Sequence, residues 1–155
     1  MKLYVIRHGN TDSNRLGIYN GKLLNEDINN IGIKQAQEAS KKIKNLNLDL
    51  IICSPLLRTR HTCDIINSNK IKVIYDDRIE ERNCGVLTNT KIDNFYYTEY
   101  WNYYSKVKID NLETVPELFK RVNLFLDEIK KKYRGQNILL VTHGGVARAI
   151  HFYFN

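Results

Sequence analysis

The sequence has few of the residues that mark irregular, fibrous or cross-linked proteins. Its 155 residues include only 2 prolines, 8 glycines and 3 cysteines. So little proline and glycine excludes collagen-like and low-complexity chains. No apolar run is long enough to span a bilayer, so we expect no membrane partner. The apolar stretch before Arg7 is also too short for the core of a signal peptide, so we expect a cytoplasmic protein.

The three cysteines are too few and too irregularly spaced for a disulfide framework or a structural zinc site. Cys53, Cys63 and Cys84 are an odd number and contain no C-x-x-C pair. No cluster of carboxylates points to a metal either. We therefore expect no metal ion and no other cofactor.

The chain has a net positive charge of +7, because it contains 24 Lys and Arg residues and 17 Asp and Glu residues. This balance permits an anionic partner, either nucleic acid or a small phosphorylated molecule. The densest basic runs, at residues 41–44 and 130–134, end segments of helical periodicity, where cations complement the helix dipole. Because no nucleic-acid-binding motif accompanies them, we interpret both runs as solvated helix faces and expect no nucleic acid, and the charge by itself does not identify the anionic partner.

The pattern of apolar residues predicts one α/β domain covering residues 1–155. Short, fully apolar runs alternate with amphipathic segments of helical spacing, as in a parallel sheet that is buried on both faces. We therefore expect a three-layer α/β/α sandwich with a mostly parallel central sheet. The predicted strands lie at residues 3–6, 50–53, 71–75 and 138–141.

Helices are predicted between these strands. Periodicity indicates helices at residues 31–48 and 118–133, with another beginning near Thr11 and a short one after the last strand. Ser54 and Pro55 favour the start of a further helix, with Ser54 as the cap and Pro55 in the first turn. The aromatic stretch at residues 95–104 is expected to pack against the core, with a substrate lid as the alternative.

Three predicted strands end in residues with unusual chemistry. Arg7 and His8 follow the first strand, Ser54 and Arg58 the second, and His143 the fourth. Ligands of parallel sheets bind beyond the carboxyl ends of the strands, so these side chains are expected to meet. Arginine binds phosphate oxygens in a bidentate way, and a histidine among cations is kept neutral and nucleophilic. Attack on phosphorus would give a phosphohistidine.

Segments along nearly the whole chain resemble, in order, the motifs of the histidine phosphatase superfamily, the phosphoglycerate-mutase-like proteins. Residues 7–14 (RHGNTDSN) are similar to its R-H-G-x-T-x-x-N opening. Residues 54–62 (SPLLRTRHT) are similar to S-P-L-x-R-A-x-x-T, and residues 141–148 (VTHGGVAR) to V-S-H-G-G-x-x-R. Further likenesses lie at residues 28–36, 80–85 and 113–121.

The resemblance implies a phosphoglycerate-mutase-like fold and a metal-independent phosphatase acting on phosphate monoesters. It implies that His8 is the nucleophile and Glu81 the general acid and base, although the neighbouring Glu80 leaves the choice of acid open. It further implies a phosphate pocket completed by Arg7, Arg58, His143, Asn14 and Gly144. Arg82 is a candidate for contact with substrate or phosphate, with a structural ion pair as the alternative.

Two departures from the family pattern bear on function. The segment at residues 86–112, which is expected to cover the site, is short for the family. A short cover leaves a phosphohistidine open to water, which favours hydrolysis over mutase transfer. Relatives continue beyond the position of Asn155, so Phe152 and its aromatic neighbours are expected to be partly exposed and to support a homodimer.

Three alternatives to a phosphatase remain open from the sequence. A phosphoglycerate-type mutase would isomerise its substrate faster than it releases phosphate. A catalytically silent phosphate-binding module would bind esters without forming a phosphoenzyme. A nucleic-acid-binding protein, suggested by net charge alone, would show affinity that falls steeply with salt.

Overall fold

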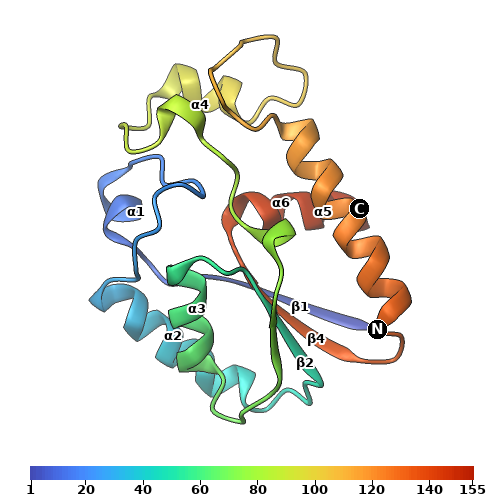
Figure 1. Cartoon of the computed structure of the whole chain (residues 1–155). Helices are drawn as coiled ribbons and strands as arrows, with labels where there is room; N and C mark the ends of the chain where they lie inside the picture. The colour runs from blue at the N-terminus through green and yellow to red at the C-terminus, as the bar shows by residue number, and fades with distance from the viewer.

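The chain forms a four-stranded sheet with helices packed on both of its faces (Figure 1). The computed structural model describes residues 1–155 except for the side chains of residues 94–96. All strand pairs are parallel, and the strand order is β1-β4-β2-β3. The strands are β1 (Lys2–Arg7), β2 (Leu50–Cys53), β3 (Val73–Tyr75) and β4 (Asn137–Thr142). The predicted α/β/α class with a parallel sheet is confirmed.

Six α-helices connect and follow the strands in the described part of the chain. They are α1 (Asp12–Leu16), α2 (Asn30–Ile43), α3 (Leu57–Ile66), α4 (Asn94–Tyr100), α5 (Val115–Lys132) and α6 (Gly144–Phe154). Short 3-10 turns at Asp77–Ile79 and Gly85–Leu87 interrupt the segment between β3 and α4. The longest helix, α5, begins with a capping box formed by Thr114 and Glu117. Within the described residues, no helix is long and apolar enough to cross a membrane.

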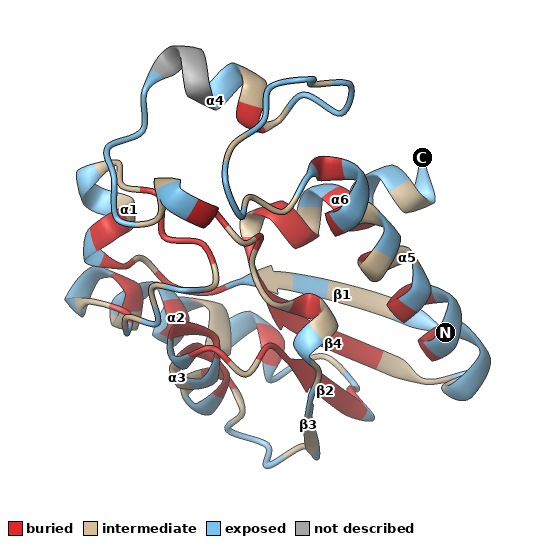
Figure 2. Ribbon diagram, turned by 45° about the horizontal axis from the view of Figure 1, so that its top comes forward, coloured by how far each residue is buried: buried red, intermediate tan, exposed pale blue. Residues whose placement is uncertain are grey.

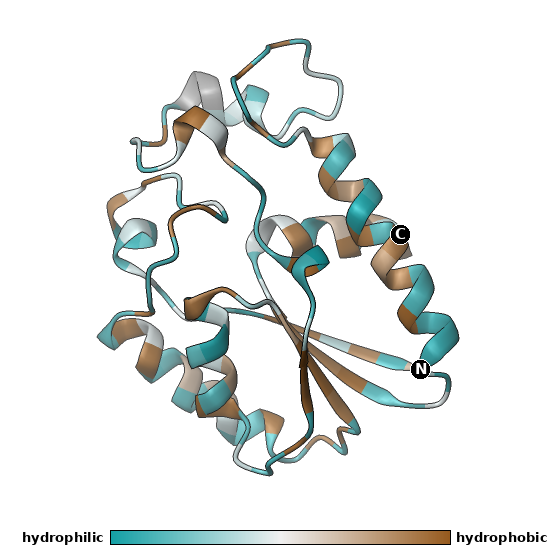
Figure 3. Cartoon of the chain, viewed as in Figure 1, coloured by the Kyte–Doolittle hydropathy of each residue, from teal (hydrophilic) through white to brown (hydrophobic). Residues whose placement is uncertain are grey.

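Alternate side chains of the central strands supply two separate cores, which explains why these strands are apolar without interruption. Ile138 and Leu140 of β4 pack with residues of α5 and α6, whereas Leu139 and Val141 pack with residues of α2 and α3. Figure 2 shows β2 and β4 buried and the edge strand β1 less so. Figure 3 shows the same strands as the most hydrophobic part of the chain. Burial on both faces holds the sheet rigidly beneath its carboxyl edge.

The prediction that Ser54 caps the third helix is wrong. Helix α3 begins at Leu57, and its N-cap, Leu56, makes no side-chain capping bond. The Ser54 hydroxyl instead lies 2.8 Å from Nε2 of His143. Pro55 disfavours helical backbone in the residue before it, so Ser54 stays outside the helix and faces the end of β4.

Candidate active site

The residues that follow β1, β2 and β4 lie side by side because the three strands are in parallel register. The His8 N–H donates to the carbonyl of Thr142 at 3.0 Å, and the Ser54 N–H donates to Val141 at 3.0 Å. Each strand therefore delivers its next residue to one edge of the sheet. This brings His8 and His143 together, as the sequence predicts.

A close approach of two glycines holds the loop after β1 in place. A Cβ on Gly9 would lie 2.5 Å from the carbonyl oxygen of Gly32, at the start of α2, and a Cβ on Gly32 would meet Asn10 at 2.3 Å. Neither position accepts a larger residue without movement of the backbone. The Gly9 N–H also donates to Thr62 on α3 at 3.0 Å. The loop that carries His8 is thus anchored to both helices on one face of the sheet.

His8 is held as a neutral imidazole with one nitrogen free to react. Its Nδ1 lies 2.7 Å from the carbonyl oxygen of Gly9, which can only accept, so Nδ1 carries the proton and Nε2 keeps its lone pair. Burial, together with the nearby charges of Arg58 and Arg7, lowers the pKa of His8 to about 3. His8 is only 7% exposed. At neutral pH this ring is a neutral imidazole whose Nε2 can act as a nucleophile.

His143 lies against His8, with 5.1 Å between the ring centroids and 57° between the ring planes. Its Nε2 is bonded to Ser54, and its Nδ1 is buried without a partner in the described part of the molecule. Burial and the charge of Arg58 hold the pKa of His143 well below its usual range. A buried nitrogen without a partner is costly, which is expected where a ligand supplies the missing bond.

Arg58 is buried, with 1% of its surface exposed, and it is positioned by backbone carbonyls. It donates to Gly21 at 2.7 Å and to Leu24 at 3.1 Å, while its Nε has no partner in the structure as described. Burial lowers the pKa of Arg58, and Glu81 opposes that effect. A guanidinium remains charged under such a shift. Arg58 is therefore a fixed cation behind the His8 ring.

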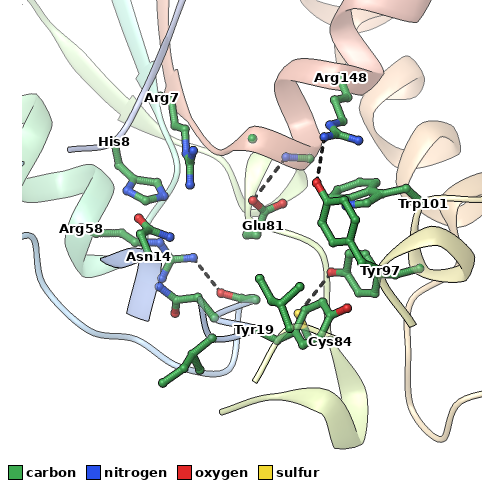
Figure 4. A pocket seen from close by; sticks show the side chains of 17 residues that line it. Arg7, His8, Asn14, Tyr19, Arg58, Glu81, Cys84, Tyr97, Trp101 and Arg148 are labelled. Carbon is green, nitrogen blue, oxygen red and sulfur yellow. Dashed lines mark hydrogen bonds between the residues drawn. The ribbon is translucent and has the colours of Figure 1, made fainter. Parts of the chain in front are cut away.

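His8 and Arg58 line a cavity to which three further predicted residues contribute from β1, α1 and α6, whereas His143 is fully buried and does not line it. Arg7 points between His8 and Glu81 (Figure 4). The Asn14 side-chain oxygen accepts the N–H of Thr11, which caps α1, so its amide N–H groups are left as donors. Gly144 begins α6, whose first N–H groups lie at the cavity wall. All three can contact an anion.

The structure separates the two adjacent acids. The Glu81 carboxylate lines the cavity and accepts the N–H of Arg82 at 2.9 Å and that of Gly145 at 3.3 Å. A Cβ on Gly145 would lie 2.4 Å from Glu81 Oε1, so a larger residue there would displace the Glu81 carboxylate. Glu80 instead pairs with Lys22 at 3.7 Å and does not line the cavity.

Arg82 is directed away from the phosphate-binding cavity, so the suggestion that it contacts phosphate is not supported by its position. Its guanidinium donates to the carbonyls of Glu113 and Tyr100 and lies 4.0 Å over the Tyr100 ring. With 1% exposure, it is a buried cation satisfied by backbone oxygens. These contacts fit a structural role, the alternative expected from the sequence. The partners of Arg82, however, are two carbonyls and an aromatic ring, and not the acid of an ion pair. Arg82 ties the segment after Glu81 to the cover.

The far wall of the cavity comes mainly from residues 18–21 and 92–101, which include part of the aromatic stretch whose alternative interpretation was a substrate lid. The cavity has a volume of about 220 Å³. The residues of this wall are Ile18, Tyr19, Asn20, Gly21, Cys84, Ile92, Tyr97, Tyr100, Trp101 and Arg148. Of the aromatic stretch, Tyr100 packs in a small core and Tyr104 is exposed, while Tyr97 and Trp101 face the cavity. Phe95 and Tyr96 lie outside the described side chains. The density of aromatic residues was the available signal for this wall.

Cys84 reaches the cavity but is not poised to react. Its Sγ lies 3.2 Å from the hydroxyl of Tyr100, and burial raises the pKa of the thiol to about 11. In the part of the chain that the structure describes, neither this cavity nor any other region has three His, Cys, Asp or Glu side chains placed to hold a metal ion.

The arrangement as a whole is a cavity that combines a neutral histidine, His8, with the arginines Arg7 and Arg58 and one carboxylate, Glu81. The model of the histidine phosphatase superfamily (branch 1) matches residues 3–155. The chain is 30% identical to phosphoserine phosphatase 1 of Hydrogenobacter thermophilus, over 97% of this chain and 74% of that protein. It is 32% identical to a protein of Yersinia pestis named as a probable phosphoglycerate mutase GpmB, over 93% of this chain and 70% of that protein.

Solved structures agree in fold. A phosphoserine phosphatase from Entamoeba histolytica, crystallised with 3-phosphoglyceric acid, superposes with a TM-score of 0.84 at 24% identity. The match covers 97% of this chain and 78% of that one. The chain belongs to the histidine phosphatase superfamily, and the family predicted from its motifs is confirmed.

Proposed function

We propose that the protein hydrolyses phosphate monoesters of small molecules through a phosphohistidine on His8. The observation that carries the proposal is the buried, neutral His8 ring beside Arg58 and His143, with the Glu81 carboxylate at the same cavity. Membership of a superfamily that includes phosphatases supports it. No step of the proposed chemistry needs a cofactor.

In the first step, the Nε2 lone pair of His8 attacks phosphorus, and the bond from phosphorus to the ester oxygen breaks. The protonated carboxyl of Glu81 gives its proton to the departing oxygen, which leaves as an alcohol. General acids of this kind contribute about 10²–10⁴-fold to rate. Arg7, Arg58, the Nδ1 of His143 and the amide of Asn14 stabilise charge on the phosphoryl oxygens.

In the second step, the Glu81 carboxylate takes a proton from water as the water oxygen attacks phosphorus. The bond from phosphorus to Nε2 breaks, and inorganic phosphate leaves with His8 restored. The cycle returns the proton to Glu81, so both charges and atoms balance. The same carboxyl serves as acid and then as base.

The test is hydrolysis of p-nitrophenyl phosphate between pH 5 and 8. We expect turnover by the wild type, its loss in His8→Ala, and its retention in His151→Ala, which changes an exposed histidine on α6. Rapid quenching in alkaline detergent with labelled substrate should trap a phosphoenzyme that is stable in alkali and labile in acid, in the wild type only. No hydrolysis in this range, or an active His8→Ala variant, would refute the proposal. Binding without a phosphoenzyme would indicate a silent binding module.

Phosphoglycerate-type transfer is the second candidate, and the likeness to the Yersinia pestis protein favours keeping it. A mutase must return the phosphoryl group to substrate before water reaches it. The cavity opens between α4 and α6 through Tyr97 and Arg148, both of which are exposed. That openness supports hydrolysis. Faster isomerisation of 3-phosphoglycerate than release of phosphate would reverse the choice.

We also propose a cytoplasmic homodimer. All three cysteines are free, as is usual in a reducing compartment. Phe152 is 66% exposed, and Phe154 borders an apolar groove with Leu3 and Val5 beside the edge strand β1. Such a surface is suited to a second copy of the chain. A sedimentation coefficient that is independent of concentration and matches a monomer would contradict the dimer.

A further inference from the structure

We infer that the cavity contains a second anion-binding group, Arg148, and that the substrate carries a carboxylate or a second phosphate in addition to its reacting phosphoryl group. The inference rests on the proposed function, because it assumes that the phosphoryl group lies at the His8 end. It concerns the opposite end of the same cavity, where Arg148, Tyr97 and Trp101 meet (Figure 4).

Arg148 lies one helical turn from the phosphate end. Positions four residues apart share a face of a helix, so Arg148 stands above Gly144 on α6. A Cβ on Gly144 would lie 3.8 Å from Arg7 Nε and 4.0 Å from Glu81 Oε2, so the first turn of α6 borders the catalytic groups. Four residues of helix rise about 6 Å. A short carbon skeleton spans that separation.

The guanidinium of Arg148 is oriented by two aromatic residues of α4 and the segment after it. It lies 4.3 Å over the ring of Trp101, and its Nη2 donates to the hydroxyl of Tyr97 at 3.3 Å. Stacking restrains the plane of the guanidinium but leaves its edges free to donate. Within the residues described, no carboxylate lies within ion-pair distance of Arg148, so most of its five N–H donors are available to a ligand.

When Glu81 is protonated, as the first step requires, the cavity has one positive charge more than a doubly charged phosphoryl group neutralises. Its lining contains three arginines, Arg7, Arg58 and Arg148, and one acid, Glu81. A phosphoryl group bound at His8 is matched by Arg7 and Arg58 at its own end. Arg148 is then unbalanced at the far end, and a second anion on the leaving group would neutralise it. Carboxylate and phosphate share the geometry that a guanidinium binds in a bidentate way.

The volume of the cavity, about 220 Å³, limits the size of this substrate. A small hydroxy acid or sugar fits the spacing between the two cationic ends better than a large, neutral alcohol does. The rings of Tyr97 and Trp101 would contact the carbon skeleton between the two anions. The substrate class that the cavity favours is therefore a small phosphate ester with a second negative charge.

The test compares matched substrates that differ in the second charge. The first pair is 3-phosphoglycerate and glycerol 3-phosphate, which has a neutral hydroxymethyl group in place of the carboxylate. The second is fructose 1,6-bisphosphate and fructose 1-phosphate. We expect the wild type to prefer the more anionic member of at least one pair by about 10-fold in kcat/KM, since hydrogen bonds to charged groups are the stronger ones. The pair that shows the preference identifies carboxylate or phosphate as the ligand.

Arg148→Met should abolish that preference, and Arg148→Lys should restore part of it. Arg134→Met, which removes an exposed arginine outside the cavity, is the matched control and should keep the wild-type ratio. Circular dichroism checks that each variant is folded. A wild type without preference in either pair, or a ratio unchanged in Arg148→Met, would overturn the inference.

The failure of the proposed function would be seen separately. If the wild type hydrolyses p-nitrophenyl phosphate but Arg148→Met keeps the substrate preference, the phosphatase stands and the second anion site does not. If no ester is hydrolysed, the proposed function fails. Calorimetric binding of the same two pairs then tests whether Arg148 binds a second anion. Binding of the more anionic ligand must then weaken in Arg148→Met and remain in Arg134→Met.

Discussion

The two ends of the cavity are built by different kinds of contact. At the phosphate end, buried side chains are held by the backbone: Arg58 donates to two carbonyls, and His8 is oriented by the carbonyl of Gly9. At the far end, Arg148 is exposed and is held by one hydrogen bond and one ring. Backbone contacts persist when side chains change, whereas contacts between side chains do not.

This difference separates the chemistry of the protein from its choice of substrate. The reacting groups belong to the sheet and to helices packed on it, where movement is costly. The far wall belongs to the cover around α4, which is joined to the rest by few buried groups, among them Arg82 and Tyr100. We therefore expect substitutions at the sheet edge to affect turnover and substitutions in the cover to affect substrate affinity. Three predictions test the comparison.

The largest effect is expected from Glu81→Gln. Because an amide cannot supply a proton, kcat/KM for an alkyl phosphate, which reports the first step alone, should fall by about 10²–10⁴-fold. The loss should be smaller for p-nitrophenyl phosphate, whose leaving group needs no proton. Steady-state kinetics with both esters measure this contrast.

Glu80→Gln is the matched control for this prediction, because Glu80 pairs with Lys22 and does not line the cavity. Its kinetics should match those of the wild type. Equal losses in the two variants, or an equal loss for both esters in Glu81→Gln, would contradict the assignment of the general acid.

The next largest effect is expected from Arg82→Met, which removes the contacts of the Arg82 guanidinium with the cover. Two buried carbonyls lose their donor and Tyr100 loses a cation, so the free energy of unfolding should fall by about 2–4 kcal/mol. KM should rise more than kcat falls, because the reacting groups keep their own backbone contacts. Urea unfolding and steady-state kinetics measure the two effects.

Arg60→Met is the control for the loss of an arginine that stacks on a ring, because Arg60 is exposed and lies 5.5 Å from the ring of Tyr75. Its cost should stay within about 0.5 kcal/mol. A fall in kcat without a change in KM in Arg82→Met would place Arg82 among the groups that act on the reaction itself. Partial rescue by Arg82→Lys would show that the positive charge matters.

The smallest effect, when it is measured over the first pH unit below 6.5, is a loss of stability in mild acid. The pKa of His8 is lowered from 6.5 to about 3, so between these values the unfolded chain binds a proton that the folded chain does not. The free energy of unfolding should therefore be unaffected above pH 6.5. It should fall below that pH, by up to about 1.4 kcal/mol per pH unit for each such histidine, and level off near pH 3.

His143, whose pKa is also lowered, adds to the same slope. Urea unfolding at a series of pH values measures it, and His8→Asn should make the slope shallower. The same shift predicts that protonation of His8 does not limit kcat/KM between pH 5 and 7. An unchanged slope in His8→Asn would mean that His8 is already protonated in the folded protein.

Much of the sheet and of the phosphate end was predictable from the sequence, because both depend on local pattern. Uninterrupted apolar strands occur only where a sheet is covered on both faces, and Arg7 and His143 each adjoin such a strand. The start of α3 was predicted wrongly because the Ser54 hydroxyl can bond either to the N-terminus of a helix or to another segment. In the structure it bonds to His143, at the end of β4, which is distant in sequence.

The far wall could not be predicted in the same way. In the sequence, Tyr97 and Trp101 fit either core packing or a substrate lid, and Arg148 is a motif residue to which no role was assigned. Their meeting depends on how the cover folds back over α6, which no periodic pattern encodes. Glu80 and Glu81 are likewise equivalent as neighbours, and only the turn after β3 directs one of them into the cavity.

The sequence by itself determined the class of fold, the family and the strand ends that carry reactive groups, since strand periodicity and short motifs act over a few residues. The tertiary structure alone decided that Glu81 faces the cavity, that Arg82 contacts the cover and that Arg148 lines the far end of the cavity. Those outcomes depend on contacts between segments that are distant in sequence. Side chains that look equivalent in the sequence differ there in their burial and in the hydrogen bonds that they can form.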